Sequence, residues 1–417
     1  MFDYDYAYGL AVRLSQSPRF TGTEGEAEAR GLILEELTHS GYAPKLEEFN
    51  VKVYEVHRAE LSVLSPFEEG VQASPIGFSG ETTGVEARLV YIENSDRALI
   101  PSDSGWVGLA TGRPSAESWR LLAKRASGLV VSEGTPYRDL SRVSVPWEWR
   151  EKFGNLPAVY VSYRDAVKLL AAERVRLVLE QTYRDTLSYN IVAEKTGYKY
   201  PEEIILVTAH YDSVLGVPGA TDNAGGAALA VALAKSLSDR ALKRTVRFVL
   251  FGAEELGLRG SQAYVEKHKD EQKKTVLVVN LDVHGGALGS SASIVSGSKS
   301  LRSYVESKAK EMGVNLSVTE DVMSSDSTSF VWKWKVPAVN IFRASGSGSD
   351  IHTVRDSVEH LHPVAFRLIG EFTCRFLLDL ANSEEVPFEK AVPDDIWKKA
   401  DEYFKKRLAL LEDETSS

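Results

Sequence analysis

The second half of the chain alternates between apolar runs and helical segments, and this alternation constrains the fold more than any other feature. Apolar runs such as IILVTAH, TVRFVLFGAEE, VLVVNLD and VPAVNIF are separated by segments with helical character, including the alanine-rich NAGGAALAVALAKSL. Strands that are apolar along their whole length are typical of a parallel sheet whose two faces are both covered by helices. We therefore predict an α/β fold with a mostly parallel central sheet flanked by helices on both faces.

The 417 residues are enough for two domains. After a strand-like region, Pro, Ser, Gly and Thr cluster in SPFEEGVQASPIGFSGETTG, and short strand-like segments then continue to about Thr182 with two helical pieces among them. We predict a small β-rich domain at residues 68–182, inserted into a larger domain formed by residues 1–67 and 183–417. Amphipathic patterns also predict helices at residues 24–41 and 394–412, the latter with a solvated charged face.

Composition excludes several classes of partner. The chain has 49 basic and 59 acidic residues and no dense basic patch, so nucleic acid is not an expected partner. No apolar stretch approaches the roughly 18 residues of a membrane span, so no membrane partner is expected either. The single cysteine, Cys374, can form neither an internal disulfide nor a thiolate metal cage. Together with an amino terminus that does not read as an export signal, this predicts a cytoplasmic protein.

Metal-binding residue types follow the predicted strands. IILVTAH ends in His210, TVRFVLFGAEE ends in Glu254 and Glu255, and VLVVNLD ends in Asp282. VPAVNIF continues into the loop ASGSGSD, which leads to His352. Ligands of open α/β sheets bind beyond the carboxyl ends of the strands, so these side chains are expected in one crevice. Imidazole and carboxylate together suit zinc, cobalt or manganese.

The acids at this crevice are expected to have different roles, in metal binding and in proton transfer. Asp222 opens the alanine-rich helix and is our choice for a carboxylate that bridges two cations. Asp212 lies two residues after His210, so it can accept the second imidazole proton. Glu254 and Glu255 are neighbours whose side chains point apart, so one can bind metal while the other accepts a proton from water.

The ordered motifs resemble those of the dinuclear zinc aminopeptidase and glutamate carboxypeptidase family, to which bacterial leucyl aminopeptidases belong. The motifs are HYD at 210–212, PGATDNAGG at 218–226, EELGLRGS at 254–261, NLD at 280–282 and IHTVRDS at 351–357. The amino-terminal SPRFTGTEGEAEAR is similar to the opening helix of the family. The inserted region, which ends in LPAVYVSYRDAVKLL, resembles a protease-associated domain.

The resemblance implies a zinc exopeptidase type of fold and two divalent metal ions, zinc first, with cobalt or manganese as alternatives. The implied ligands are His210, Asp222 and Asp282 for one ion and Asp222, Glu255 and His352 for the other. The resemblance also implies that Glu254 is the general base, that Asp212 supports His210, and that the bond from Asp222 to Asn223 is cis.

Two positions depart from the family pattern. Many members have tyrosine before the last histidine ligand, where it helps to polarise the scissile carbonyl, and this chain has Ile351. His284 and Arg343 are candidate substitutes, and the metals alone are a third possibility. Many members also have Ser-Asp-His where this chain has Ser-Asp-Ser at 325–327, which leaves Asp326 as a possible acceptor.

We therefore expect a dinuclear metal-dependent exopeptidase, first of all an aminopeptidase that hydrolyses peptides by metal-activated water. Alternatives are a carboxypeptidase or amidohydrolase with the same site, a glutaminyl cyclase-like acyltransferase with a single zinc, and a catalytically silent binding module. The complete set of ligands for two ions argues against the cyclase, and the presence of both ligands and base argues against a silent module. Composition and motifs leave the oligomeric state open.

Overall fold

The computed structural model describes residues 2–345 and 350–411. The chain divides into two compact units, each formed from separate segments. The first unit comprises Met1–Val51, Leu187–Ile351 and Asp356–Glu402. The second comprises Lys52–Thr186, His352–Arg355 and Tyr403–Ser417. The insert boundaries at residues 68 and 182 stay a prediction.

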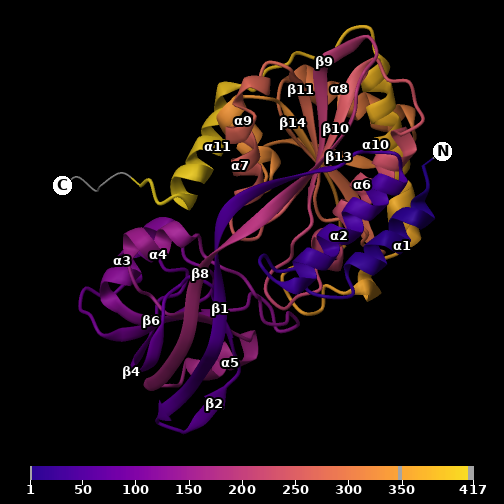
Figure 1. Ribbon diagram of the computed structural model, residues 1–417. Helices are drawn as coiled ribbons and strands as arrows, with labels where there is room; N and C mark the ends of the chain where they lie inside the picture. The colour runs from indigo at the N-terminus through magenta and orange to yellow at the C-terminus, as the bar shows by residue number, and fades with distance from the viewer. Residues whose placement is uncertain (1, 346–349, 412–417) are drawn as a thin grey trace. The chain divides into compact units, whose positions relative to one another are not determined.

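A mixed, mostly parallel sheet forms the centre of the first unit (Figure 1). Its order is β13 (Leu316–Glu320), β12 (Gly289–Ser296), β14 (Ala338–Ser345), β11 (Thr275–Leu281), β9 (Tyr200–His210), β10 (Arg244–Phe251) and β8 (Arg174–Lys195). The four strands β14, β11, β9 and β10 are parallel, whereas β12 and β8 run antiparallel to their neighbours β14 and β10. The predicted α/β sheet is confirmed, and the apolar runs are its central strands.

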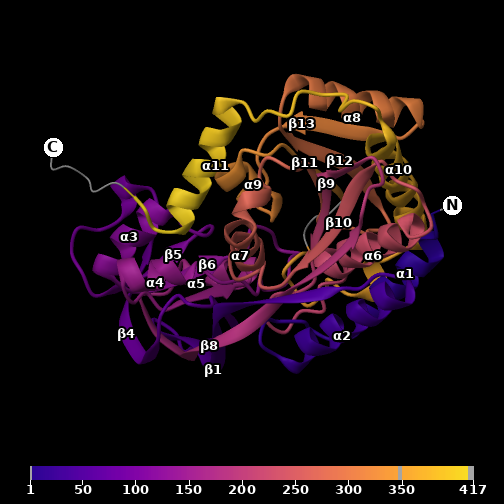
Figure 2. The same ribbon diagram turned by 45° about the horizontal axis from the view of Figure 1, so that its top comes forward.

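Helices cover both faces of this sheet (Figures 1 and 2). One face carries α1 (Tyr4–Leu14), α2 (Glu24–His39), α6 (Gly225–Leu237), α8 (Lys299–Glu311) and α10 (Pro363–Asn382). The other carries α7 (Arg259–Lys267), α9 (Ser327–Trp334) and the first part of α11 (Asp394–Arg407). The alanine-rich α6 is buried on almost every side because α1, α2 and α10 all pack against it. Among the described residues, no helix has the length and apolarity needed to cross a bilayer.

The second unit is built on parallel strands. Its strands β4 (Thr82–Tyr91), β5 (Trp106–Ala110), β6 (Ala126–Ser132) and β7 (Ala158–Val161) are parallel, and β3 (Ala73–Pro75) runs antiparallel to β7. β1 (Lys45–Ser65) pairs with β2 (Glu69–Val71). The two expected helical pieces are α3 (Ala116–Arg125) and α5 (Tyr163–Leu169), and α4 (Trp147–Phe153) was not expected. A short helical turn of this unit is η1 (Arg97–Leu99), and the first unit contains three more: η2 (Ala220–Ala224), η3 (Lys269–Glu271) and η4 (Val358–His360).

Gly226, in the first turn of α6, allows a close approach of this helix to the sheet. A Cβ at this position would lie 2.2 Å from Oδ1 of Asn223 and 2.4 Å from the carbonyl oxygen of Leu281. We expect Gly226→Ala to lower the free energy of unfolding by about 1 to 3 kcal/mol, because backbone and side chain must shift. Thermal unfolding measures this effect. Gly9→Ala in α1 is the control, since its Cβ would meet nothing within 4 Å; equal melting temperatures for the two variants would contradict this packing.

Candidate metal centre

Three adjacent parallel strands deliver the predicted ligands to one edge of the sheet. His210 is the last residue of β9, Asp282 follows β11, and Glu254 and Glu255 come shortly after β10. β9 lies between the other two strands, with His210 beside Phe251 of β10. Because the strands are parallel, their carboxyl ends meet at the same edge, as expected from the sequence.

The side chains at this edge lie within reach of a shared cation. Nε2 of His210 is 3.1 Å from Oδ1 of Asp222 and 3.3 Å from Oδ1 of Asp282. Ligand atoms within 4.8 Å of one another are offered by His210, Asp222 and Asp282. A second such group consists of His210, Glu254 and Glu255. Five of the predicted site residues are therefore brought together inside the first unit.

Asp212 lies beside the imidazole of His210 and holds the turn that carries the two glutamates. Its Oδ1 lies 3.5 Å from Nδ1 of His210 and accepts a hydrogen bond from the backbone N–H of Glu254 at 3.0 Å. Its Oδ2 accepts from the N–H of Glu255 at 3.2 Å. The sequence predicted the contact with His210, but it did not predict the two backbone contacts. This carboxylate therefore holds the turn after β10 beside the end of β9.

Asp222 lies in the turn η2, between β9 and α6. Its peptide bond to Asn223 is cis, as the family resemblance implied. Nδ2 of Asn223 donates to the carbonyl of Leu281 at 2.9 Å, and its Oδ1 accepts from the N–H of Gly226 at 3.0 Å. Asn223 thus ties the residue after Asp222 both to the end of β11 and to the start of α6.

The cluster carries a surplus of buried negative charge. Burial raises the pKa of Glu254 well above its usual value, and the charges of Glu255 and Asp282 add to this. Burial alone would lower the pKa of His210, but Glu254 and Asp282 are among the acids that hold it well above 6.5. Buried carboxylates gathered around an imidazole are stabilised by a cation, so the donor set fits a divalent metal such as zinc.

Backbone strain is found directly beside these residues. Ala253, before Glu254, has a φ of 56°, and Val283, after Asp282, has a φ of 60°. Positive φ is costly for residues with a Cβ and most of all for a β-branched residue, and such strain concentrates at functional sites. The N–H of Arg343 donates to the carbonyl of Val283 at 2.8 Å and helps to hold this conformation.

Comparison with known proteins agrees with this geometry. Residues 190–377 match the sequence profile of Peptidase family M28. This part of the chain is therefore similar to family M28. The matched range contains β9, β10 and β11 and therefore the five clustered side chains.

Proteins that resemble this chain include enzymes with different names. Aminopeptidase YwaD of Bacillus subtilis (strain 168) is 28% identical over 97% of this chain and 90% of its own length. Carboxypeptidase Q of Rattus norvegicus is 41% identical, but over only 30% of this chain and 29% of its own. The structure of BSAP, a zinc aminopeptidase from Bacillus subtilis, aligns with a TM-score of 0.77 at 23% identity, covering 95% of this chain and 99% of BSAP. That likeness confirms the zinc exopeptidase type of fold.

Among the predicted ligands, His352 alone belongs to the second unit. Its φ is 63°, and its carbonyl accepts a hydrogen bond from the N–H of Arg142 at 2.8 Å. Residues 346–349 of the loop expected to deliver it lie outside the described residues. The assignment of His352 as a ligand stays a prediction.

The two candidate substitutes for the missing tyrosine both have structural partners. His284 is buried and donates from Nε2 to the carbonyl of Ile341 at 2.7 Å. Burial lowers the pKa of His284 to about 4, so its imidazole is neutral at pH 7. Arg343 donates to the carbonyl of Gly286 and to the hydroxyl of Ser291, both at 3.1 Å. These bonds link neighbouring strand ends, and they favour a structural role for both residues.

Ser325 is a site residue that the sequence did not reveal. Its hydroxyl donates to Oδ2 of Asp282 at 2.5 Å and accepts from Nδ2 of Asn280 at 2.7 Å. It therefore orients the carboxylate of a predicted ligand. The neighbouring Asp326 is fully buried, and burial raises its pKa to about 7. The family's Ser-Asp-His pattern pointed to this segment, but not to the serine.

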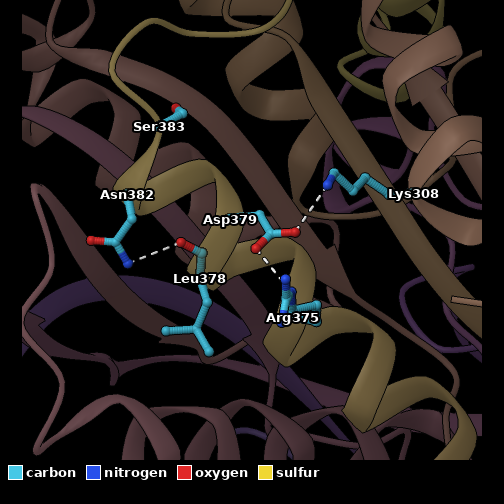
Figure 3. A pocket seen from close by; sticks show the side chains of 6 residues that line it. All are labelled: Lys308, Arg375, Leu378, Asp379, Asn382 and Ser383. Atoms are coloured by element: carbon cyan, nitrogen blue, oxygen red, sulfur yellow. Dashed lines mark hydrogen bonds and ion pairs between the residues drawn. The ribbon is translucent and has the colours of Figure 1, made fainter. Parts of the chain in front are cut away.

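A hollow elsewhere on the first unit does not form a second site. It measures about 490 Å³ and lies on α8 and α10 (Figure 3). Its two cations are already paired with one acid, since Lys308 and Arg375 each lie 2.9 Å from an oxygen of Asp379. The hollow therefore offers little unpaired charge to a ligand.

Proposed function

We propose that this chain is a metal-dependent aminopeptidase that removes amino-terminal residues from peptides. The observation that carries the proposal is the convergence of His210, Asp222, Asp282, Glu254 and Glu255 at one edge of the sheet. The similarity to an aminopeptidase along almost the whole chain supports the activity. An acid-rich crevice attracts the free amine of a peptide, which is the physical reason to place the cleaved bond at the amino terminus.

We also propose that two divalent ions, most simply zinc, bind in this crevice. His210, Asp222 and Asp282 would hold one ion, and Asp222, Glu255 and His352 would hold the other. When bound, such ions polarise the scissile carbonyl and make water acidic enough to lose a proton near neutral pH. The donor types support this proposal, because imidazole and carboxylate are the usual protein ligands of zinc apart from thiolate.

In this proposal the residues of the chain move the proton and keep the geometry. Glu254 accepts a proton from the attacking water and transfers it to the amine that leaves when the C–N bond breaks. Asp212 holds the backbone N–H of Glu254, so the base stays beside the ligands. Ile351 has no hydroxyl to donate to the substrate carbonyl, so this residue cannot polarise it.

We also propose a role for the inserted region. We propose a protease-associated-like role for residues 68–182, supported by the resemblance of LPAVYVSYRDAVKLL. A cytoplasmic location and the absence of nucleic-acid partners stay predictions from composition.

Reporter peptides test both the activity and the direction of cleavage. We expect aminoacyl reporters with a free amine to be hydrolysed, amino-acetylated reporters to resist, and a chelator to abolish activity until zinc is added back. The chelated protein should also melt at a lower temperature, since an ion present at 100 times its Kd stabilises the folded state by about 2.7 kcal/mol. Release of carboxyl-terminal residues alone would favour a carboxypeptidase instead, and activity that survives chelation would contradict the metal mechanism.

A further inference from the structure

Asp356 makes an unusually complete set of hydrogen bonds to the turn that carries Asp222. It is only 1% exposed. Its Oδ1 accepts from the N–H and from the hydroxyl of Thr221, both at 2.8 Å, and its Oδ2 accepts from the N–H of Asp222 at 3.0 Å. The backbone carbonyl of Asp356 accepts from the N–H of Ala220 at 3.2 Å. Three consecutive residues of η2 are thus held by one residue that is 134 positions away from Asp222.

The chemistry of this contact requires both carboxylate oxygens. Each oxygen faces at least one N–H donor, and an amide side chain would replace one oxygen with a donor of its own. A buried N–H that loses its acceptor costs about 1 to 3 kcal/mol. Placing a second buried acid beside Asp222 is also unfavourable by itself, so the arrangement indicates a need to fix this turn.

The loop that leads from β9 to η2 is held by a buried cation. Arg19 donates from Nε to the carbonyl of Tyr211 at 2.7 Å and from Nη2 to the carbonyl of Gly219 at 2.8 Å. It also bonds the carbonyls of Leu14 and Pro218. Arg19 therefore fixes the loop from the end of β9 to Gly219, and Asp356 fixes the next three residues up to Asp222.

We propose that Asp356 is a positioning residue that sets the orientation of the Asp222 carboxylate for bridging two cations. It acts through the backbone of Thr221 and Asp222 and touches neither substrate nor metal. The inference rests on the proposed function, because it assumes that Asp222 binds metal. It adds a second role for the motif IHTVRDS, in which His352 is a predicted ligand and Asp356 holds the bridge.

Zinc titration of the metal-free full chain against a chromogenic chelator tests this inference. We expect wild type to bind about two ions per chain and Asp356→Asn to bind at least one of them about 10- to 100-fold more weakly, as for other residues that orient a ligand. Its kcat should fall more than its KM rises. Thr221→Val is the matched control: it removes one hydroxyl donor and keeps both backbone bonds, so its loss of affinity should be smaller.

The outcomes separate this inference from the proposed function. Wild-type affinity and stoichiometry in Asp356→Asn would overturn the positioning role, whatever its activity. Failure of the wild-type chain to bind zinc would overturn the proposed function first. If Asp356→Asn does not fold, Asp356→Glu keeps two acceptor oxygens on a longer side chain. For that variant we expect a weaker Co²⁺ complex with an altered visible spectrum, and a spectrum and affinity equal to wild type would overturn the inference.

Discussion

Replacing Glu254 by glutamine should lower kcat by about 10²- to 10⁴-fold, the range contributed by a general acid–base group. Glutamine has nearly the shape of glutamate but cannot accept a proton, so binding of substrate and metal should change little. The backbone N–H of residue 254 would still be held by Asp212. Steady-state kinetics on an aminoacyl reporter, with zinc content measured on the same sample, tests this prediction.

The neighbouring residue supplies the control. Glu255→Gln should lower metal content as well as kcat, because Glu255 is a predicted ligand. The two variants differ only in which of two adjacent carboxylates is neutralised, so a general loss of negative charge cannot explain a difference between them. Full activity of Glu254→Gln would remove Glu254 from the role of base.

Asp222→Asn should abolish activity and deplete both ions, which is the second large effect that we expect. An amide has one oxygen acceptor and no charge, so it cannot replace the carboxylate that we propose as the bridge between two cations. By contrast, Asp282→Asn should weaken mainly one ion, because Asp282 is predicted to contact only one. Metal analysis after dialysis at a fixed free zinc concentration measures both effects.

The exposed Asp395 on α11 provides a matched control for charge. Asp395→Asn removes the same charge far along the chain from the predicted ligands, and its metal content should equal that of wild type. If Asp222→Asn retains two ions per chain, Asp222 is not the bridge. If it retains one, the division of ligands between the two ions must be reassigned.

The sheet and most of the cluster could be predicted because both depend on local patterns. Apolar runs mark strands buried on both faces, and a charged or imidazole side chain at the carboxyl end of such a run, as at His210 and Asp282, lies at the carboxyl edge of the sheet. Parallel strand order then brings these residues together without any knowledge of register. The helix predicted at residues 24–41 is confirmed as α2, because it too depends on a local pattern. Its predicted stop, Gly41, has a φ of 86°.

The supporting contacts could not be predicted because they join backbone groups to distant side chains. Arg19 bonds carbonyls about 200 positions later, and Asp356 bonds amides about 135 positions earlier. No residue pattern shows which backbone N–H will lack a partner inside the fold. Both residues lie in motifs that resemble the family, SPRFTG and IHTVRDS, yet the motifs alone gave no reason for their presence. The positive φ of Val283 was also unexpected, because β-branched residues rarely adopt it.

Anomalous diffraction at the zinc absorption edge, from crystals grown with zinc, would locate the ions relative to the predicted ligands. We expect two peaks: one beside His210, Asp222 and Asp282, and a second beside Asp222, Glu255 and His352. Zinc bound only at other side chains, or no anomalous peak at the carboxyl edge of β9, β10 and β11, would contradict this prediction.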